Sequence, residues 1–190
     1  MKPLKIISIY NNEKVLIKRA LKGHPEAQKL LYETHAPTML SVCRQYIRDI
    51  HFAEDVMIGG FVKVFKYLDS FRFEGSFEGW VRRIMIRESI SYLRKKQFVV
   101  FDEEAYRNHG ETDAYQMSGF EVDHIQSLID ELPEGYKLVF VLFAIEGYKH
   151  QEIAEMLEIS ESTSKSQLFK ARKLLQKRLK EQNIVGYGTR

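Results

Sequence analysis

The sequence contains a single cysteine, Cys43, and its histidines never occur as an i, i+4 pair. One cysteine cannot form an internal disulfide or a multi-cysteine zinc site, and we expect Cys43 to be a small buried residue of a helix rather than a reactive thiol. Histidines without helical spacing do not predict a metal site. A glycine-rich phosphate-binding motif and a recognisable nucleophile set are also absent. These absences predict a protein that is not an enzyme and that needs no metal or cofactor.

Long apolar segments are missing as well. The longest uninterrupted run is LVFVLFAI, residues 138–145, which is far shorter than the roughly 18 residues that suggest a membrane span. The first residues, MKPLKIISIYNNEK, lack the small-residue cleavage pattern of a secretory signal. We therefore expect a soluble, cytoplasmic protein.

The chain shows no convincing run of alternating polar and apolar residues, the pattern of a half-buried strand. Apolar residues instead recur every three or four positions, which predicts an all-helical, all-α fold. A helix is expected to begin at Pro25, a favoured first-turn residue, and its apolar stripe continues to Ile47. Pro37 is expected to bend or interrupt this helix. Further helices are predicted from near Ala53 and over residues 79–96.

Charge is distributed unevenly along the chain, although the formal net charge is only +3. Residues 13–97 carry sixteen Lys or Arg against ten Asp or Glu, whereas residues 98–122 carry one base and six acids. The second segment also has little periodicity, which is typical of a linker. We therefore predict two small helical domains, residues 1–97 and 123–190, joined by an acidic linker at residues 98–122.

The second domain contains the spacing of a helix-turn-helix. It is expected to open at Asp123, where D-x-x-Q resembles a helix cap, and to continue with a buried helix over residues 136–145. Residues 149–179 then indicate a short helix, a three-residue turn and a longer helix. Ser160 is a natural N-cap for the longer helix, and Glu161 lies favourably at its positive end.

The longer helix has two distinct faces when its residues are placed at about 100° intervals. The apolar face is formed by Leu168, Ala171, Leu175 and Leu179, and the opposite face by Ser166, Lys170, Lys173, Lys177 and Lys180. The first turns of a recognition helix reach base edges in the major groove. The predicted base-reading residues are accordingly Lys165, Ser166, Gln167 and Lys170, and the predicted phosphate contacts are Arg172, Lys173, Lys177 and Lys180. A basic face that is merely solvated is the alternative.

Two segments carry motifs of a known family. Residues 53–96 read AEDVMIGGFVKVFKYLDSFRFEGSFEGWVRRIMIRESISYLRKK, and residues 132–175 contain LPEGYKLVFVLFAIEGYKHQEIAEMLEIS followed by STSKSQLFKARKLL. The first segment is similar to the second region, and the other to the fourth region, of extracytoplasmic-function sigma factors, the small two-domain members of the bacterial sigma-70 family. The resemblance covers residues 13–179, and the two segments stand in the order that the family has.

The resemblance implies an alternative sigma factor that binds core RNA polymerase and directs promoter-specific initiation of transcription. The second domain would bind the −35 promoter element and the flap of the second-largest polymerase subunit. The first domain would bind the clamp of the largest subunit and open the −10 element. An anti-sigma factor is a further expected partner. The alternative is a free-standing helix-turn-helix regulator that does not depend on core polymerase.

Opening the −10 element requires a surface that holds unpaired bases, and aromatic rings provide one by stacking. The predicted single-strand contacts are Arg72, Phe73, Phe77, Trp80, Arg83 and Arg87. Phe73 and Phe77 are flanked by polar residues and are expected to be exposed. For Phe71 and Trp80, a place in the core is the favoured interpretation.

The resemblance places polymerase contact on a helix over residues 55–65. The predicted contacts are Asp55, Met57, Ile58 and Phe61. Family members usually have Gln-Glu where this chain has Ile58-Gly59, and Gly60 follows. Two adjacent glycines within a helix cost roughly 1 kcal/mol each relative to alanine. One hypothesis is that Ile58 provides apolar burial at the interface in place of the usual polar contacts.

Smaller departures from the family pattern concern the helix-turn-helix. Glu158 stands where the turn usually has glycine, and Lys149 where a capping serine is common, so both should weaken the fold slightly. Gln167 replaces a frequent arginine and suggests an altered base preference, because glutamine pairs well with adenine. The acidic linker has two open interpretations, either a segment that enters the polymerase channel, as in the family, or a solvated tether.

Overall fold

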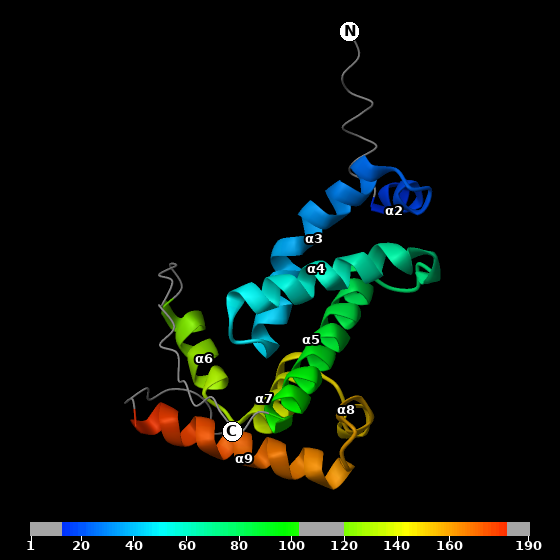
Figure 1. Ribbon diagram of the computed structural model, residues 1–190. Coiled ribbons are helices and arrows are strands. Elements are labelled where there is room, and N and C mark those ends of the chain that lie inside the picture. Colours follow the sequence, from blue (N-terminus) through cyan, green and yellow to red (C-terminus); the bar gives the residue numbers. More distant parts are fainter. Residues whose placement is uncertain (1–12, 103–119, 182–190) are drawn as a thin grey trace. The chain divides into compact units, whose positions relative to one another are not determined.

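The computed structural model describes residues 13–102 and 120–181 of the chain, with side chains for residues 13–95 and 124–181. Every regular element in these ranges is helical, as the apolar periodicity predicts (Figure 1). The chain divides into two compact units, Met1–Gln97 and Phe98–Arg190. None of the described helices is long and apolar enough to cross a membrane.

The first unit contains four α-helices and one short 3-10 turn in its described part. They are α2 (Glu13–Leu21), α3 (Pro25–Tyr46), α4 (Ile50–Lys66), η1 (Leu68–Ser70) and α5 (Phe77–Asp102). Figure 1 shows α2 beside the start of α3, and α4 crossing the end of α3. Asp49 begins α4, because its side chain accepts hydrogen bonds from the backbone N–H groups of His51 and Phe52.

Helix α3 continues through Pro37 without interruption, so a break at this residue does not occur. The exposed position of Pro37 gives the reason. The carbonyl that loses its N–H donor, that of Glu33, lies at the surface and can bind water instead. The predicted burial of Cys43 is confirmed, since its side chain is fully enclosed between the helices.

The two adjacent glycines of α4 have opposite surroundings. A Cβ atom at Gly60 would overlap the sulfur of Met85 on α5, whereas a Cβ atom at Gly59 would meet nothing within 4 Å. Gly60 therefore permits close packing of α4 on α5, and its low helix propensity is offset by that contact. Lys63 and Glu88 reinforce the same pair of helices with a 2.7 Å ion pair.

The second unit is built from four α-helices and a π-helical turn in its described part. They are α6 (Phe120–Asp130), α7 (Glu134–Phe140), the π-helical turn over Val141–Ile145, α8 (His150–Leu157) and α9 (Glu161–Glu181). In Figure 1, α9 is the long orange-to-red helix, with α8 near its start and α6 near its far end. The predicted helix over residues 136–145 thus changes its hydrogen-bond pattern after Phe140.

The predicted helix cap at Asp123 is wrong, because Asp123 lies inside α6, which begins at Phe120. Gln126 donates a hydrogen bond forward to Asp130 (Nε2 to Oδ1, 3.2 Å). This is an i, i+4 pair within a helix and not a capping box. The helical backbone also reaches past both predicted limits of the acidic linker, to Asp102 and from Phe120, while residues 103–119 lie outside the described residues.

Two interactions fix α6 within the second unit. Lys137 of α7 lies 2.6 Å from Asp130 (Nζ to Oδ1), and the two side chains are only 6% and 4% exposed. Arg178 of α9 donates hydrogen bonds to the backbone carbonyls of Leu128 and Glu131, 3.3 Å each, at the end of α6. These contacts tie α6 both to α7 and to α9, the recognition helix candidate.

Candidate nucleic-acid interface

The turn between α8 and α9 has the geometry of a helix-turn-helix. Glu158 ends α8 in the left-handed backbone region (φ 56°), where glycine is usual. Ser160 caps α9 as predicted, because its Oγ accepts a hydrogen bond from the N–H of Thr163 at 3.0 Å. Lys149 cannot accept a bond as serine would, but its own N–H donates to Glu152 Oε2 at 2.7 Å. Both helix starts therefore remain partly capped.

A small core holds α8 against α9. Ile153 of α8 is buried together with Leu168 and Ala171 of α9, the centre of the predicted apolar face. A polar contact lies beside this core, since His150 Nδ1 is 2.9 Å from the hydroxyl of the buried Ser164. The His150 ring also stacks on Phe143, with 4.6 Å between ring centroids. These contacts fix which side of α9 faces outward.

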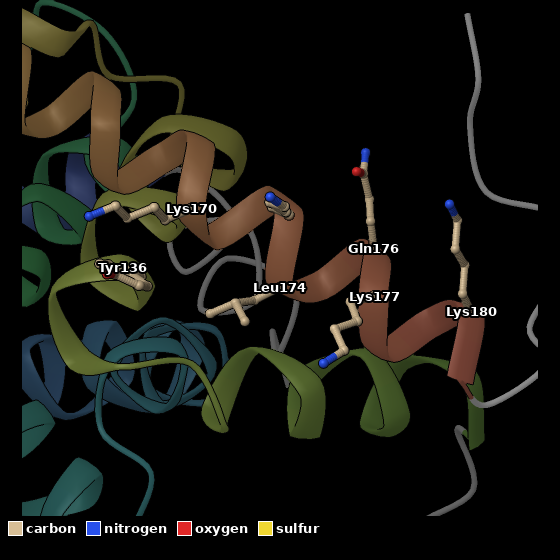
Figure 2. Close-up of a pocket in the computed structure, with 7 residues that line it drawn as sticks. Tyr136, Lys170, Leu174, Gln176, Lys177 and Lys180 are labelled. Atoms are coloured by element: carbon tan, nitrogen blue, oxygen red, sulfur yellow. The ribbon is translucent and has the colours of Figure 1, made fainter.

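The opposite face of α9 is exposed, as predicted. All five of its members, Ser166, Lys170, Lys173, Lys177 and Lys180, are exposed, and so are Lys165 and Arg172, which lie nearer to the apolar face. An open groove on this face is lined by Tyr136, Leu174, Gln176 and four of the lysines. Figure 2 shows Gln176 and Lys180 projecting to one side of α9, and Leu174 and Lys177 to the other. The cationic groups are therefore spread over a broad surface and do not form a single row.

The predicted base-reading residues occupy different environments. Lys165 pairs with Glu161 at 2.7 Å, and this hydrogen bond lowers the pKa of the Glu161 carboxyl. Gln167 is half-buried against Gly135, so its amide is less available than the sequence alone suggests. Lys170 lies over the Tyr136 ring, 5.9 Å from its centroid, and remains exposed.

Phe169 is an exposed aromatic side chain outside the DNA contacts predicted from the sequence. It is 68% exposed and lies on α9 between Ser166 and Lys173. Its angular position, about 100° from Leu168, already excludes it from the apolar face. That angle could have predicted the exposure of Phe169 from the sequence, because a phenylalanine off the apolar face does not reach the core.

The predicted phosphate contacts are exposed, and two of them have partners within the chain. Arg172 stacks its guanidinium on Phe143, with Cζ 5.5 Å from the ring centroid. Lys177 forms a surface ion pair with Glu181 at 3.7 Å. Exposed pairs of this kind contribute little to stability, so an external anion can compete for Lys177.

The first unit contains an aromatic cluster at the loop between η1 and α5. Phe71 is central to it, with ring centroids 4.9 Å from Phe73, 5.3 Å from Phe77 and 5.5 Å from Trp80. Phe71 is buried and Trp80 is half-buried, which agrees with their expected place in the core. Phe73 is 36% exposed, as expected.

The expected exposure of Phe77 is wrong, because only 1% of this residue is exposed. Phe77 is the first residue of α5, and its ring stacks with Trp80 and packs edge-on against His35 of α3. Polar neighbours in sequence do not prevent burial at the start of a helix, where side chains on one face turn inward. Phe77 therefore supports the loop, and it is not a surface for bases.

Phe73 has a backbone conformation that is unusual for its side chain. Its φ angle is +59°, in the left-handed region that bulky residues seldom adopt. Such a conformation costs about 1–2 kcal/mol and persists only where the surroundings impose it. The predicted arginines Arg72, Arg83 and Arg87 are all exposed. The loop thus presents one ring at the surface of a unit that also exposes these three guanidinium groups.

The predicted partner-binding set on α4 needs correction at two positions. Met57 and Phe61 are buried in the first unit and cannot contact another protein without a rearrangement, and the Phe61 ring packs edge-on against Tyr32 of α3. Asp55 and Ile58 are exposed, and 51% of Ile58 is accessible. Val62, one turn after Ile58, is 63% exposed and lies outside the polymerase contacts predicted from the sequence. The i, i+4 spacing of Ile58 and Val62 was the signal that could have identified it.

Comparison with family models and curated proteins gives matches in both units. Residues 31–99 match sigma-70 region 2, and residues 123–175 match sigma-70 region 4. The chain is 28% identical over 178 residues to the ECF RNA polymerase sigma factor SigW of Bacillus subtilis, covering 87% of this chain and 95% of that protein. It is 25% identical over 180 residues to the ECF RNA polymerase sigma-E factor of Escherichia coli, covering 86% and 92%.

Solved structures share the fold at lower sequence identity. The sigma factor RpoE from Bartonella quintana, solved in complex with the anti-sigma factor NepR, is 20% identical with a TM-score of 0.57 and covers 80% of this chain and 96% of its own. CnrH, solved in complex with the cytosolic domain of CnrY, is 22% identical with a TM-score of 0.51 and covers 89% and 97%.

Proposed function

The chain belongs to the sigma-70 family as an alternative RNA polymerase sigma factor of the extracytoplasmic-function group, and from this premise we propose which of its surfaces bind DNA and polymerase. The proposal assigns duplex recognition to α9, single-strand binding to the loop between η1 and α5, and polymerase binding to α4. The observation that carries it is the exposed cationic face of α9, which lies opposite the core formed by Leu168 and Ala171.

The start of α9 reads the −35 element in this proposal. Ser166 and Lys170 are exposed in its first turns, where a recognition helix reaches base edges. Phe169 lies between them and is suited to an apolar contact with a thymine methyl group. Lys173, Lys177 and Lys180 lie farther along the helix and pair with phosphates, which fixes the register without reading the sequence.

The loop of the first unit holds an unpaired base of the −10 element. Phe73 is its exposed ring, Phe71 packs against that ring, and the buried Phe77 packs against Phe71. Arg83 and Arg87, on the exposed face of α5, are placed to follow the phosphates of the displaced strand. The division of work between a stacking ring and basic side chains suits a site that opens DNA.

Core polymerase binds the exposed side of α4, through an apolar patch formed by Ile58 and Val62. Both side chains are more than half exposed, and Gly59 leaves the helix backbone open beside them. A bound partner would remove this apolar area from water. The hypothesis that Ile58 replaces the usual polar contacts is therefore extended to Val62.

An anti-sigma factor is a further proposed partner. Two structural relatives were solved as complexes, RpoE with the anti-sigma factor NepR and CnrH with the cytosolic domain of CnrY. Such a partner would compete with core polymerase if it covered Ile58 and Val62. Since core polymerase acts in the cytoplasm, the proposed site of action is cytoplasmic, and no catalytic step is assigned to the chain itself.

The test of the proposed function is transcription in vitro. The full chain is added to core polymerase from the bacterium that encodes it, together with a library of fragments from that genome. Specific transcripts are expected only when both proteins are present, and they identify the promoters. The absence of any chain-dependent transcript would contradict the proposal. Tight, specific binding to duplex DNA by the chain alone would instead support a free-standing regulator.

A further inference from the structure

A lysine from the first described helix lies against the loop ring. Lys14 of α2 is placed with its ammonium group 5.4 Å from the centroid of the Phe73 ring. This is within the range of a cation–π contact. Lys14 is exposed, and within the described part of the chain it has no carboxylate partner. A cation therefore stands at the surface where an unpaired base would stack.

Helix α2 is held firmly enough to position this cation. Leu16, Ile17 and Ala20 are buried between α2 and its neighbours. Glu13, the residue before Lys14, places Oε1 3.3 Å from Nε2 of the buried His35, within ion-pair distance although not in hydrogen-bond geometry. His35 in turn packs edge-on against Phe77 beneath the loop. The start of α2 and the aromatic cluster are thus parts of one packed assembly.

From these contacts we propose that Lys14 is a DNA-binding residue of the loop site. Its ammonium group pairs with a phosphate of the unpaired nucleotide whose base stacks on Phe73. A base entering the ring face displaces the ammonium from it, and the nearest negative charge on the incoming ligand is the phosphate of the same strand. The single-strand site then has a ring from the loop and a cation from α2. This inference rests on the proposed function, because it assumes that the loop binds single-stranded DNA.

A purely structural role predicts different behaviour. If Lys14 only braced Phe73, its removal would weaken binding through disorder of the loop, and the salt dependence of binding would stay the same. If Lys14 pairs with a phosphate, its removal also lowers the salt dependence, because one fewer counterion is released on binding. The salt dependence therefore separates the two roles.

The experiment uses the full chain in holoenzyme with core polymerase. The probe is a fork-junction DNA from an identified promoter, with a double-stranded −35 element and a single-stranded non-template −10 strand. The variants are Lys14→Gln, Lys14→Arg and, as a matched control, Lys18→Gln, because Lys18 is exposed one turn farther along α2. Affinity is measured from about 50 to 200 mM salt, and thermal unfolding confirms that each variant is folded.

For Lys14→Gln we expect about fivefold weaker binding to the fork and a salt slope reduced by about 0.7. Lys14→Arg and Lys18→Gln should bind as the wild type does, and a duplex that ends before the −10 element should not distinguish any of them. The inference is overturned if Lys14→Gln behaves like Lys18→Gln, or if it binds more weakly with an unchanged salt slope. If wild-type holoenzyme does not bind the fork, the proposed function itself fails, and this inference fails with it.

Discussion

Met85 places its sulfur in the volume that a side chain at Gly60 would require, whereas Gly59 faces open space. Two neighbouring glycines of one helix therefore predict different effects of the same substitution. Gly59→Ala is expected to raise the free energy of unfolding by about 0.5–1 kcal/mol, because alanine has the higher helix propensity. Gly60→Ala is expected to gain less than Gly59→Ala, because the thioether of Met85 must move to make room for the new methyl group. Urea denaturation of the two variants measures both effects, and equal gains at the two positions would contradict the described packing.

The buried ion pair of the second unit gives a prediction about stability. Lys137→Met leaves Asp130 buried without its cationic partner, and should lower the free energy of unfolding by about 3–5 kcal/mol. The double variant Asp130→Leu/Lys137→Met removes both charges and should recover most of that loss. Chemical denaturation compares the three proteins. Equal stability of Lys137→Met and the wild type would show that the pair is solvated in solution.

Phe169 should read a thymine methyl group. Replacing each thymine of the −35 element in turn by deoxyuridine removes only that methyl group. At one position the replacement should weaken DNA binding by wild-type holoenzyme about fourfold, which corresponds to about 0.8 kcal/mol for one buried methyl group. Phe169→Ala should bind the two DNAs equally. A difference that persists in Phe169→Ala would assign the methyl contact to another residue.

Replacing Lys170 by alanine should change sequence preference, whereas replacing Lys173 should change overall affinity. Lys170→Ala is expected to relax the preference at one base pair by about 1–3 kcal/mol, because its position suits a base edge. Lys173→Ala is expected to weaken binding to all sequences alike and to reduce the salt slope by about one unit. Competition binding with a set of single-base variants of the −35 duplex separates these results. Equal loss of specificity in both variants would mean that the base-reading and phosphate-binding roles are assigned wrongly.

Replacing Phe73 of the loop should affect promoter opening, whereas replacing Phe77 at the start of α5 should affect stability. Phe73→Gly relieves the positive φ angle and removes only a partly exposed ring, so the free energy of unfolding should change by less than about 1 kcal/mol while promoter opening is lost. Phe77→Ala empties a buried site and should lower the free energy of unfolding by about 3–5 kcal/mol. Opening can be followed by 2-aminopurine fluorescence in the −10 element. Normal opening by Phe73→Gly would remove Phe73 from the site.

Cys43 should be unreactive in the folded protein. Burial raises the pKa of its thiol to about 11, and a hydrogen bond with Ser89 opposes only part of that change. Because the folded pKa exceeds the ordinary value of 9.0, almost no thiolate exists at pH 8, and labelling by a thiol reagent should require unfolding. The labelling rate with and without urea measures this. Rapid labelling under native conditions would show that the core of the first unit opens readily.

The helical fold and the two faces of α9 could be predicted from the sequence because both depend on periodicity. Leu168 and Ala171 are buried and Lys170 and Lys173 are exposed, as their angular positions require. The N-cap of α9 at Ser160 could be predicted as well, because capping depends only on residues close together in the sequence.

Features that depend on contacts between helices could not be predicted in this way. The sequence around Phe77 is polar, yet the ring is buried because His35 of α3 and Trp80, three residues farther along α5, pack against it. Met57 and Phe61 follow the same rule on α4, where packing decides which side of an apolar helix remains open. The contact of Lys14 with Phe73 joins residues far apart in the chain, and no local pattern indicates it.

The hydrogen bonds of Arg178 to the end of α6 have a mechanical consequence. Helix α9 is therefore held near its last turns by Arg178 as well as at its capped beginning. Lys177 and Lys180 lie on either side of Arg178 in the sequence. A displacement of α6 would therefore shift the last turns of α9 and, with them, two of the proposed phosphate contacts.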